Sequence, residues 1–102
     1  MKTISVVIID DEPGSVITLL ELLKQYCPQV VIKGTAADPL RGYDLIKLSE
    51  PDLVFLDIQM PGKTGFELLE ELDSVPKVIF TTAYDEYALK AFEFNALDYL
   101  LK

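Results

Sequence analysis

Acidic, hydroxyl and ammonium side chains stand directly after short apolar runs at four places in this sequence. Asp10 and Asp11 follow residues 4–9, Asp57 follows 53–56, Thr81 and Thr82 follow 78–80, and Lys102 follows 97–101. Carboxylates can attack phosphorus and can hold a hard divalent cation. A lysine and a hydroxyl can bind phosphoryl oxygens. These residue types therefore indicate phosphoryl-transfer chemistry, provided that the fold brings the four places together.

The apolar runs alternate with segments of helical periodicity. Strands are predicted over residues 4–9, 30–32, 52–56, 78–80 and 97–101, because these runs are short and rich in β-branched or aromatic residues. Helices are predicted over 13–26, 39–48, 66–72 and 85–95, with prolines at or near several of their ends. The order of elements is therefore βαβαβαβαβ.

Alternation of this kind favours an α/β fold in which an open parallel sheet carries helices on both faces. Five strands favour the flavodoxin-like order 2-1-3-4-5, in which strands 1, 3, 4 and 5 are neighbours. The carboxyl ends of these strands carry Asp10, Asp11, Asp57, the two threonines and Lys102, so we expect them to share one small pocket. Strand 2 offers only Gly34 and Thr35.

Crowded carboxylates need a positive charge. Two of them ~4 Å apart at an effective dielectric constant of ~20 repel by roughly 4 kcal/mol. Mg²⁺ suits a site of oxygen ligands, so we assign Asp11 and Asp57 as direct ligands and Asp10 as a ligand through water. The alternative for Asp10 and Asp11 is a solvated turn before a helix.

Asp57 is the candidate nucleophile, because Pro61-Gly62 keeps the following loop open. Lys102 would pair with the phosphoryl oxygens, and Thr82 would donate a hydrogen bond to one of them. The alternatives are a solvated lysine and an ordinary strand-end threonine. The chain contains no histidine and one cysteine, Cys27, which speaks against a zinc site or an internal disulfide.

The composition limits the possible partners. The 102 residues are enough for one domain, and the net charge of −8 opposes direct contact with nucleic acid. No apolar run approaches the ~20 residues that cross a bilayer, and the first residues lack the pattern of a secretory signal. We therefore expect a cytoplasmic protein without membrane contact.

Residues 7–13, 55–69, 80–83 and 98–102 together resemble a response-regulator receiver domain of bacterial two-component systems. The resemblance implies that Asp57 accepts a phosphoryl group from a sensor histidine kinase. It also implies that Asp11, Asp57 and the main-chain carbonyl of Gln59 hold Mg²⁺ with the help of Asp10. Thr82 would then be the switch hydroxyl and Tyr99 the switch aromatic.

Residues 83–99 are similar to the subgroup whose output is a LytTR-type DNA-binding domain. Members of the family continue past the lysine with a proline and a fifth helix. The resemblance thus implies that residues 1–102 are the receiver domain, that the fifth helix is missing, and that the output domain lies outside this sequence. Without that helix, apolar side chains of the fifth strand would face water, so we expect a homodimer or another form of self-association, or else a markedly unstable chain.

Three other functions fit parts of the pattern. A magnesium-dependent phosphatase of the haloacid dehalogenase kind also uses an aspartate nucleophile, but its second acid would stand where this chain has Gln59. A flavodoxin-like cofactor binder would have a loop rich in Ser, Thr and Gly after the first strand. A receiver-like docking module would need no metal. We expect a signalling switch and not a turnover enzyme.

Overall fold

The computed structural model describes residues 2–102, and for Asp85 and Phe92 it describes the backbone only. Within this part of the chain, five strands form one parallel sheet in the order β2-β1-β3-β4-β5. The strands are β1 (Ile4–Ile9), β2 (Val30–Ala36), β3 (Leu53–Asp57), β4 (Lys77–Thr82) and β5 (Asp98–Leu101). The predicted flavodoxin-like order is confirmed.

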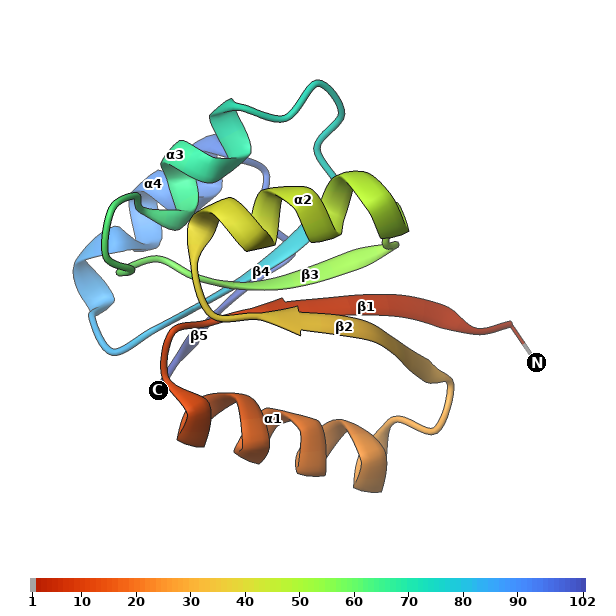
Figure 1. Cartoon of the computed structure of the whole chain (residues 1–102). Helices are drawn as coiled ribbons and strands as arrows, with labels where there is room; N and C mark the ends of the chain where they lie inside the picture. The colour runs from red at the N-terminus through yellow and green to blue at the C-terminus, as the bar shows by residue number, and fades with distance from the viewer. Residues whose placement is uncertain (1) are drawn as a thin grey trace.

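Helices cover both faces of the sheet (Figure 1). They are α1 (Pro13–Tyr26), α2 (Pro39–Ser49), α3 (Gly65–Glu70) and α4 (Ala88–Glu93), and the 3₁₀ turn η1 (Asp85–Tyr87) precedes α4. Helix α1 lies on one face, while α2, α3 and α4 lie on the other (Figure 1). Among residues 2–102, none of the helices combines the length and the apolar character that a bilayer crossing requires.

The apolar side chains form two core clusters, one on each face of the sheet. Val7 and Ile9 belong to the cluster beneath α2 and α3, whereas Val6 and Ile8 belong to the cluster beneath α1. Successive side chains of a strand point to opposite faces, so a central strand covered on both sides must be apolar throughout. This explains the unbroken apolar run of β1.

Local signals set the starts of α2 and α3. The Asp38 carboxylate accepts a hydrogen bond of 2.8 Å from the Arg41 amide, and Pro39 begins α2. Thr64 and Glu67 form a reciprocal capping box at the start of α3. Because a cap satisfies amide groups that have no partner inside the helix, these residues fix where each helix begins.

The amino ends of β1 and β3 are joined by side chains. The Asp52 carboxylate accepts hydrogen bonds from the Ser5 amide at 2.8 Å and from the Ser5 hydroxyl at 3.0 Å. The Asp52 amide donates to the same hydroxyl at 2.9 Å. The bonds from the Ser5 amide and hydroxyl lower the pKa of Asp52 below its usual value. This Ser5–Asp52 link lies at the edge of the sheet opposite to the end of β3 at Asp57.

Two sequence predictions need correction. Strand β2 does not end near Ile32 but continues through Ala36, because a register shift opposite Val6 and Val7 lets it keep pairing with β1. The predicted helix over 85–95 is shorter and begins with η1; Asn95 lies outside it with φ of 56°, a left-handed conformation that ends a helix.

We predict that Gly65→Ala destabilises the chain by about 1–3 kcal/mol, because a crowded site cannot accept an extra methyl group without strain. A Cβ at position 65 would lie 2.5 Å from the Asp57 carbonyl oxygen and 3.0 Å from Leu56 Cγ. Urea unfolding without Mg²⁺ measures the change. The control is Gly14→Ala, whose Cβ would meet nothing within 4 Å. Equal stability of the two variants would contradict the proposed close approach of α3 to Asp57.

Candidate functional site

The carboxyl ends of the central strands bring acidic side chains together. Asp10 and Asp11 follow β1, and Asp57 ends the neighbouring strand β3. Carboxylate oxygens of Asp10, Asp11, Glu12 and Asp57 all lie within 4.8 Å of one another, and we call these four residues the acidic cluster. The predicted convergence of Asp10, Asp11 and Asp57 is therefore present. Glu12 was missed, although its place beside Asp11 in the sequence could have identified it.

Lys102 reaches into the acidic cluster from the end of β5. Its ammonium nitrogen lies 2.8 Å from Asp10 Oδ2, 3.1 Å from Glu12 Oε1 and 3.4 Å from Asp57 Oδ2. Its own amide donates a hydrogen bond of 2.6 Å to the Thr82 carbonyl, which fixes the backbone at this point. The side chain is 19% exposed, so these contacts are more than a solvated surface pair.

Burial and neighbouring charges shift the pKa values of Asp57 and Lys102. Burial, and after it the negative charge of Asp10, raise the pKa of Asp57 to about 7, although Lys102 opposes the shift. Burial by itself would lower the pKa of Lys102, but its hydrogen bonds to Asp10 and Glu12 and the charges of Asp57 and Asp10 raise it above the usual value. The acidic cluster therefore carries more negative charge than one lysine neutralises.

Thr82 and Tyr99 are connected through Tyr84. Thr82 is fully buried at the end of β4, and its hydroxyl oxygen accepts a hydrogen bond of 3.1 Å from the Tyr84 amide. The Tyr99 hydroxyl donates to the Tyr84 carbonyl. The sequence analysis assigned roles to Thr82 and Tyr99 but not to Tyr84. Tyr84 makes both contacts through main-chain atoms, which every residue type carries, so its identity could not indicate them.

The Gln59 side chain is hydrogen-bonded to Tyr87. Its amide nitrogen donates a hydrogen bond to the Tyr87 hydroxyl, which links the loop after β3 to η1. The main-chain carbonyl, and not the side chain, is the group that the sequence prediction assigns to Mg²⁺. Thr81 is buried in β4 opposite Asp57, as its strand position predicts. Gly34 and Thr35 lie inside β2 and pair with β1.

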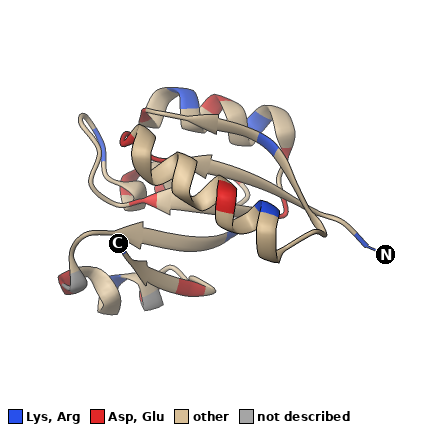
Figure 2. Ribbon diagram, turned by 90° about the horizontal axis from the view of Figure 1, so that it is seen from below, with Lys and Arg blue, Asp and Glu red and all other residues tan. Residues whose placement is uncertain are grey.

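The acidic cluster fits a magnesium ion by the chemistry of its donors. Its carboxylate oxygens are hard ligands of the kind that Mg²⁺ prefers. The pKa of Asp57 is raised first by burial and then by the charge of Asp10, and a bound cation would oppose both effects. Asp10 and Asp11 also line a hollow of about 350 Å³, which gives small ligands access. Acidic residues are scattered over helices and loops elsewhere (Figure 2). The acidic cluster differs from them in the convergence of its four carboxylates and in the burial of Asp10 and Asp57.

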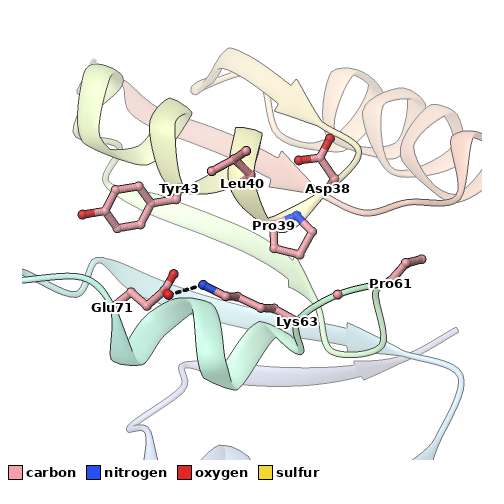
Figure 3. Close-up of a pocket in the computed structure, with 8 residues that line it drawn as sticks. Asp38, Pro39, Leu40, Tyr43, Pro61, Lys63 and Glu71 are labelled. Carbon is pink, nitrogen blue, oxygen red and sulfur yellow. Dashed lines mark hydrogen bonds and ion pairs between the residues drawn. The ribbon is translucent and has the colours of Figure 1, made fainter.

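A larger groove of about 630 Å³ lies between α2 and the region of α3 (Figure 3). Leu40 and Tyr43 approach it from α2, and Pro61 and Lys63 come from the loop before α3 (Figure 3). Lys63 pairs with Glu71, and both side chains lie on the α3 side of the groove (Figure 3). Because these charges are engaged with each other, the groove does not offer the reactive groups that the acidic cluster does.

A parallel sheet in this order, with buried acids and a lysine at its carboxyl edge, defines a receiver-type signalling domain. The family model "Response regulator receiver domain" matches residues 6–102, and this chain belongs to that family. Receiver domains are signalling proteins of two-component systems that interact with sensor histidine kinases, and they typically bind Mg²⁺ at an acidic pocket.

Relatives and solved structures agree with this assignment. The chain is 50% identical over 101 residues to an "Uncharacterized response regulatory protein" of Vibrio cholerae, covering 97% of this chain and 42% of the relative. It is 43% identical to "Transcriptional regulatory protein BtsR" of Escherichia coli, with coverage of 97% and 42%. The chain thus spans about two fifths of the length of these relatives.

Among solved structures, the response regulator protein TrrA of Thermotoga maritima superimposes with a TM-score of 0.82 at 31% identity. The match covers 100% of this chain and 87% of that chain, which was solved in complex with Mg(2+)-BeF.

We predict that Asp57→Asn stabilises the magnesium-free chain at pH 8 by about 1–3 kcal/mol, because it removes one ionised group from the acidic cluster. The folded state holds a proton on Asp57 up to a pH of about 7, whereas a free aspartate loses it near 3.8. Stability from this group is therefore present at low pH and is lost as the pH rises through about 7. The gain from Asp57→Asn should accordingly shrink at pH 5.

Thermal and urea unfolding at both pH values measure this difference. The control is Asp44→Asn, which removes the same charge from an exposed position of α2. We expect it to change stability by less than ~0.5 kcal/mol at either pH. If Asp57→Asn increased the free energy of unfolding equally at pH 5 and pH 8, the raised pKa of Asp57 would be contradicted.

Proposed function

We propose that this chain is a phosphorylation-dependent switch in which Asp57 accepts a phosphoryl group from a sensor histidine kinase in the presence of Mg²⁺. The observation that carries the proposal is the acidic cluster with the Lys102 ammonium among its carboxylates. Phosphoryl transfer depends mainly on positioning and on neutralising charge, and these residues supply both.

Asp57 supplies the reacting oxygen. A carboxylate oxygen forms the bond to phosphorus while the bond from phosphorus to the histidine nitrogen of the kinase breaks, and that nitrogen takes up a proton. Bound Mg²⁺ would neutralise charge on the carboxylates and on the phosphoryl oxygens. Asp11, Asp57 and the carbonyl of Gln59 would hold it, and Asp10 would act through water. These roles follow the family pattern and the donor chemistry.

Lys102 and Thr82 would bind the transferred group. The Lys102 ammonium already lies 3.4 Å from Asp57 Oδ2, so it can pair with an oxygen of a phosphoryl group attached there. The Thr82 hydroxyl would turn toward another oxygen and leave the Tyr84 amide without its present acceptor. The Tyr84 carbonyl accepts from Tyr99, so a shift of Tyr84 would reach the switch aromatic.

The output of the switch is proposed to lie outside residues 1–102, in a LytTR-type DNA-binding domain. The similarity of residues 83–99 to that subgroup supports this, and so does the length of the relatives, one of which is described as a transcriptional regulatory protein. Self-association is part of the proposal. Its support is the exposure of Leu97 and Leu101 on or beside β5 and of Leu89 on α4.

Incubation with acetyl phosphate and Mg²⁺ tests the central step. We expect a mass increase of one phosphoryl group that Asp57→Ala abolishes and that Asp44→Ala leaves intact. Peptide mapping should place the group on the segment that contains Asp57. A phosphoryl group elsewhere would contradict the proposal, and repeated hydrolysis of a phosphate ester would favour the phosphatase.

A second prediction concerns the metal. Asp11→Ala should weaken Mg²⁺ binding at least about tenfold, because even indirect metal partners cost 10–100-fold when removed. Isothermal titration calorimetry measures the affinity, with Asp44→Ala as a control of equal charge change. Unchanged affinity in Asp11→Ala would show that this carboxylate is not a ligand.

A further inference from the structure

One contact joins the loop after Asp57 directly to the segment before α4. The Gln59 amide nitrogen donates to the Tyr87 hydroxyl. The Tyr87 ring is half-buried and lies 6.1 Å from the Phe66 ring and 6.4 Å from the Tyr84 ring, the latter edge-on. A tyrosine whose ring packs in the core while its hydroxyl binds a loop is a fixed point for both segments.

The two partners of this contact are not equally constrained. Ile58 and Met60, on either side of Gln59, are buried, and the Ile58 amide and carbonyl make main-chain hydrogen bonds to Thr81 and Gly65. The backbone at Gln59 is therefore held independently of its side chain. Tyr87 belongs to a 3₁₀ turn of three residues, which has few bonds of its own. The contact consequently restrains η1 more than it restrains the loop.

The segment from Ala83 to Tyr87 is thus held at both ends. The Tyr84 amide donates to the Thr82 hydroxyl at one end, and the Tyr87 hydroxyl accepts from Gln59 at the other. If Thr82 turns toward a phosphoryl group on Asp57, the first attachment is lost. The segment is then still held by the Gln59–Tyr87 bond and by the bond from the Tyr99 hydroxyl to the Tyr84 carbonyl, and of these two the first restrains η1 directly.

We infer that Gln59 and Tyr87 are positioning residues that form a latch, which holds η1 and the start of α4 in the conformation of the unphosphorylated state. The inference rests on the proposed function for its link to phosphorylation, but the latch itself is a property of the unmodified chain. A bond that stabilises one of two states lowers the apparent affinity of any ligand that prefers the other.

Tyr87→Phe tests the latch, because it removes the hydroxyl and keeps the ring. We expect amide hydrogen exchange over residues 88–94 to become roughly two- to tenfold faster without Mg²⁺, the factor expected for one ordinary hydrogen bond. The affinity for beryllium fluoride with Mg²⁺, a phosphoryl mimic, should rise by a similar factor. Tyr26→Phe, at an exposed position of α1, removes a hydroxyl elsewhere and should change neither quantity.

A double variant separates the latch from simple packing. Gln59→Met keeps the length of the side chain and removes its amide, so it should accelerate exchange over residues 88–94 as Tyr87→Phe does. Adding Tyr87→Phe to Gln59→Met should then cause little further change, because the bond is already broken. Additive effects, unchanged exchange in Tyr87→Phe, or unchanged affinity for beryllium fluoride would each overturn the inference.

The exchange measurement, unlike the affinity for beryllium fluoride, is independent of whether Asp57 can be phosphorylated. If acetyl phosphate left the unmodified chain unchanged, the proposed function would fail. The exchange measurement requires neither metal nor phosphoryl group, so it would still decide whether the latch exists.

Discussion

Repulsion among buried carboxylates is the constraint on which the rest of this structure depends. The parallel sheet forces Asp10 and Asp57 to the same edge, where Lys102 lies between them and compensates part of their charge. Carboxylates so placed are costly in a folded protein unless a cation is close by. The same arrangement makes the site sensitive to any added positive or negative charge, which is what a charge-controlled switch requires.

The sequence was sufficient for most of the fold and for three acids of the acidic cluster, Asp10, Asp11 and Asp57, but not for Glu12. Continuous apolar runs such as β1 identify strands covered on both faces, and the rule that parallel strands align their carboxyl ends then places Asp10, Asp57 and Lys102 together. Contacts that depend on side-chain direction could not be derived in this way. The bond between Gln59 and Tyr87 joins a loop to the 3₁₀ turn η1, and a glutamine and a tyrosine at these positions do not by themselves indicate such a bond. The full length of β2 depends on a register shift that no periodicity reveals.

Phe66 connects the elements on the face opposite to α1. Its ring lies 4.7 Å from Phe80 of β4 and 5.1 Å from Phe94, which follows α4. The Lys90 ammonium lies 4.9 Å from the same ring, a distance typical of a cation–π contact. Close packing transmits displacement, so a change in the orientation of η1 or α4 must be accommodated around this one side chain.

The Ser5–Asp52 link has a consequence for the direction in which the domain can respond. Its three hydrogen bonds join β1 to β3 at the amino edge, and strands joined in this way cannot slide past each other without breaking them. Charge changes at the carboxyl edge must therefore be absorbed by rotamers and loops, which move on nanosecond to microsecond timescales, and not by strand register. The amino ends of β1 and β3 are thereby fixed to each other at the edge of the sheet opposite to the acidic cluster.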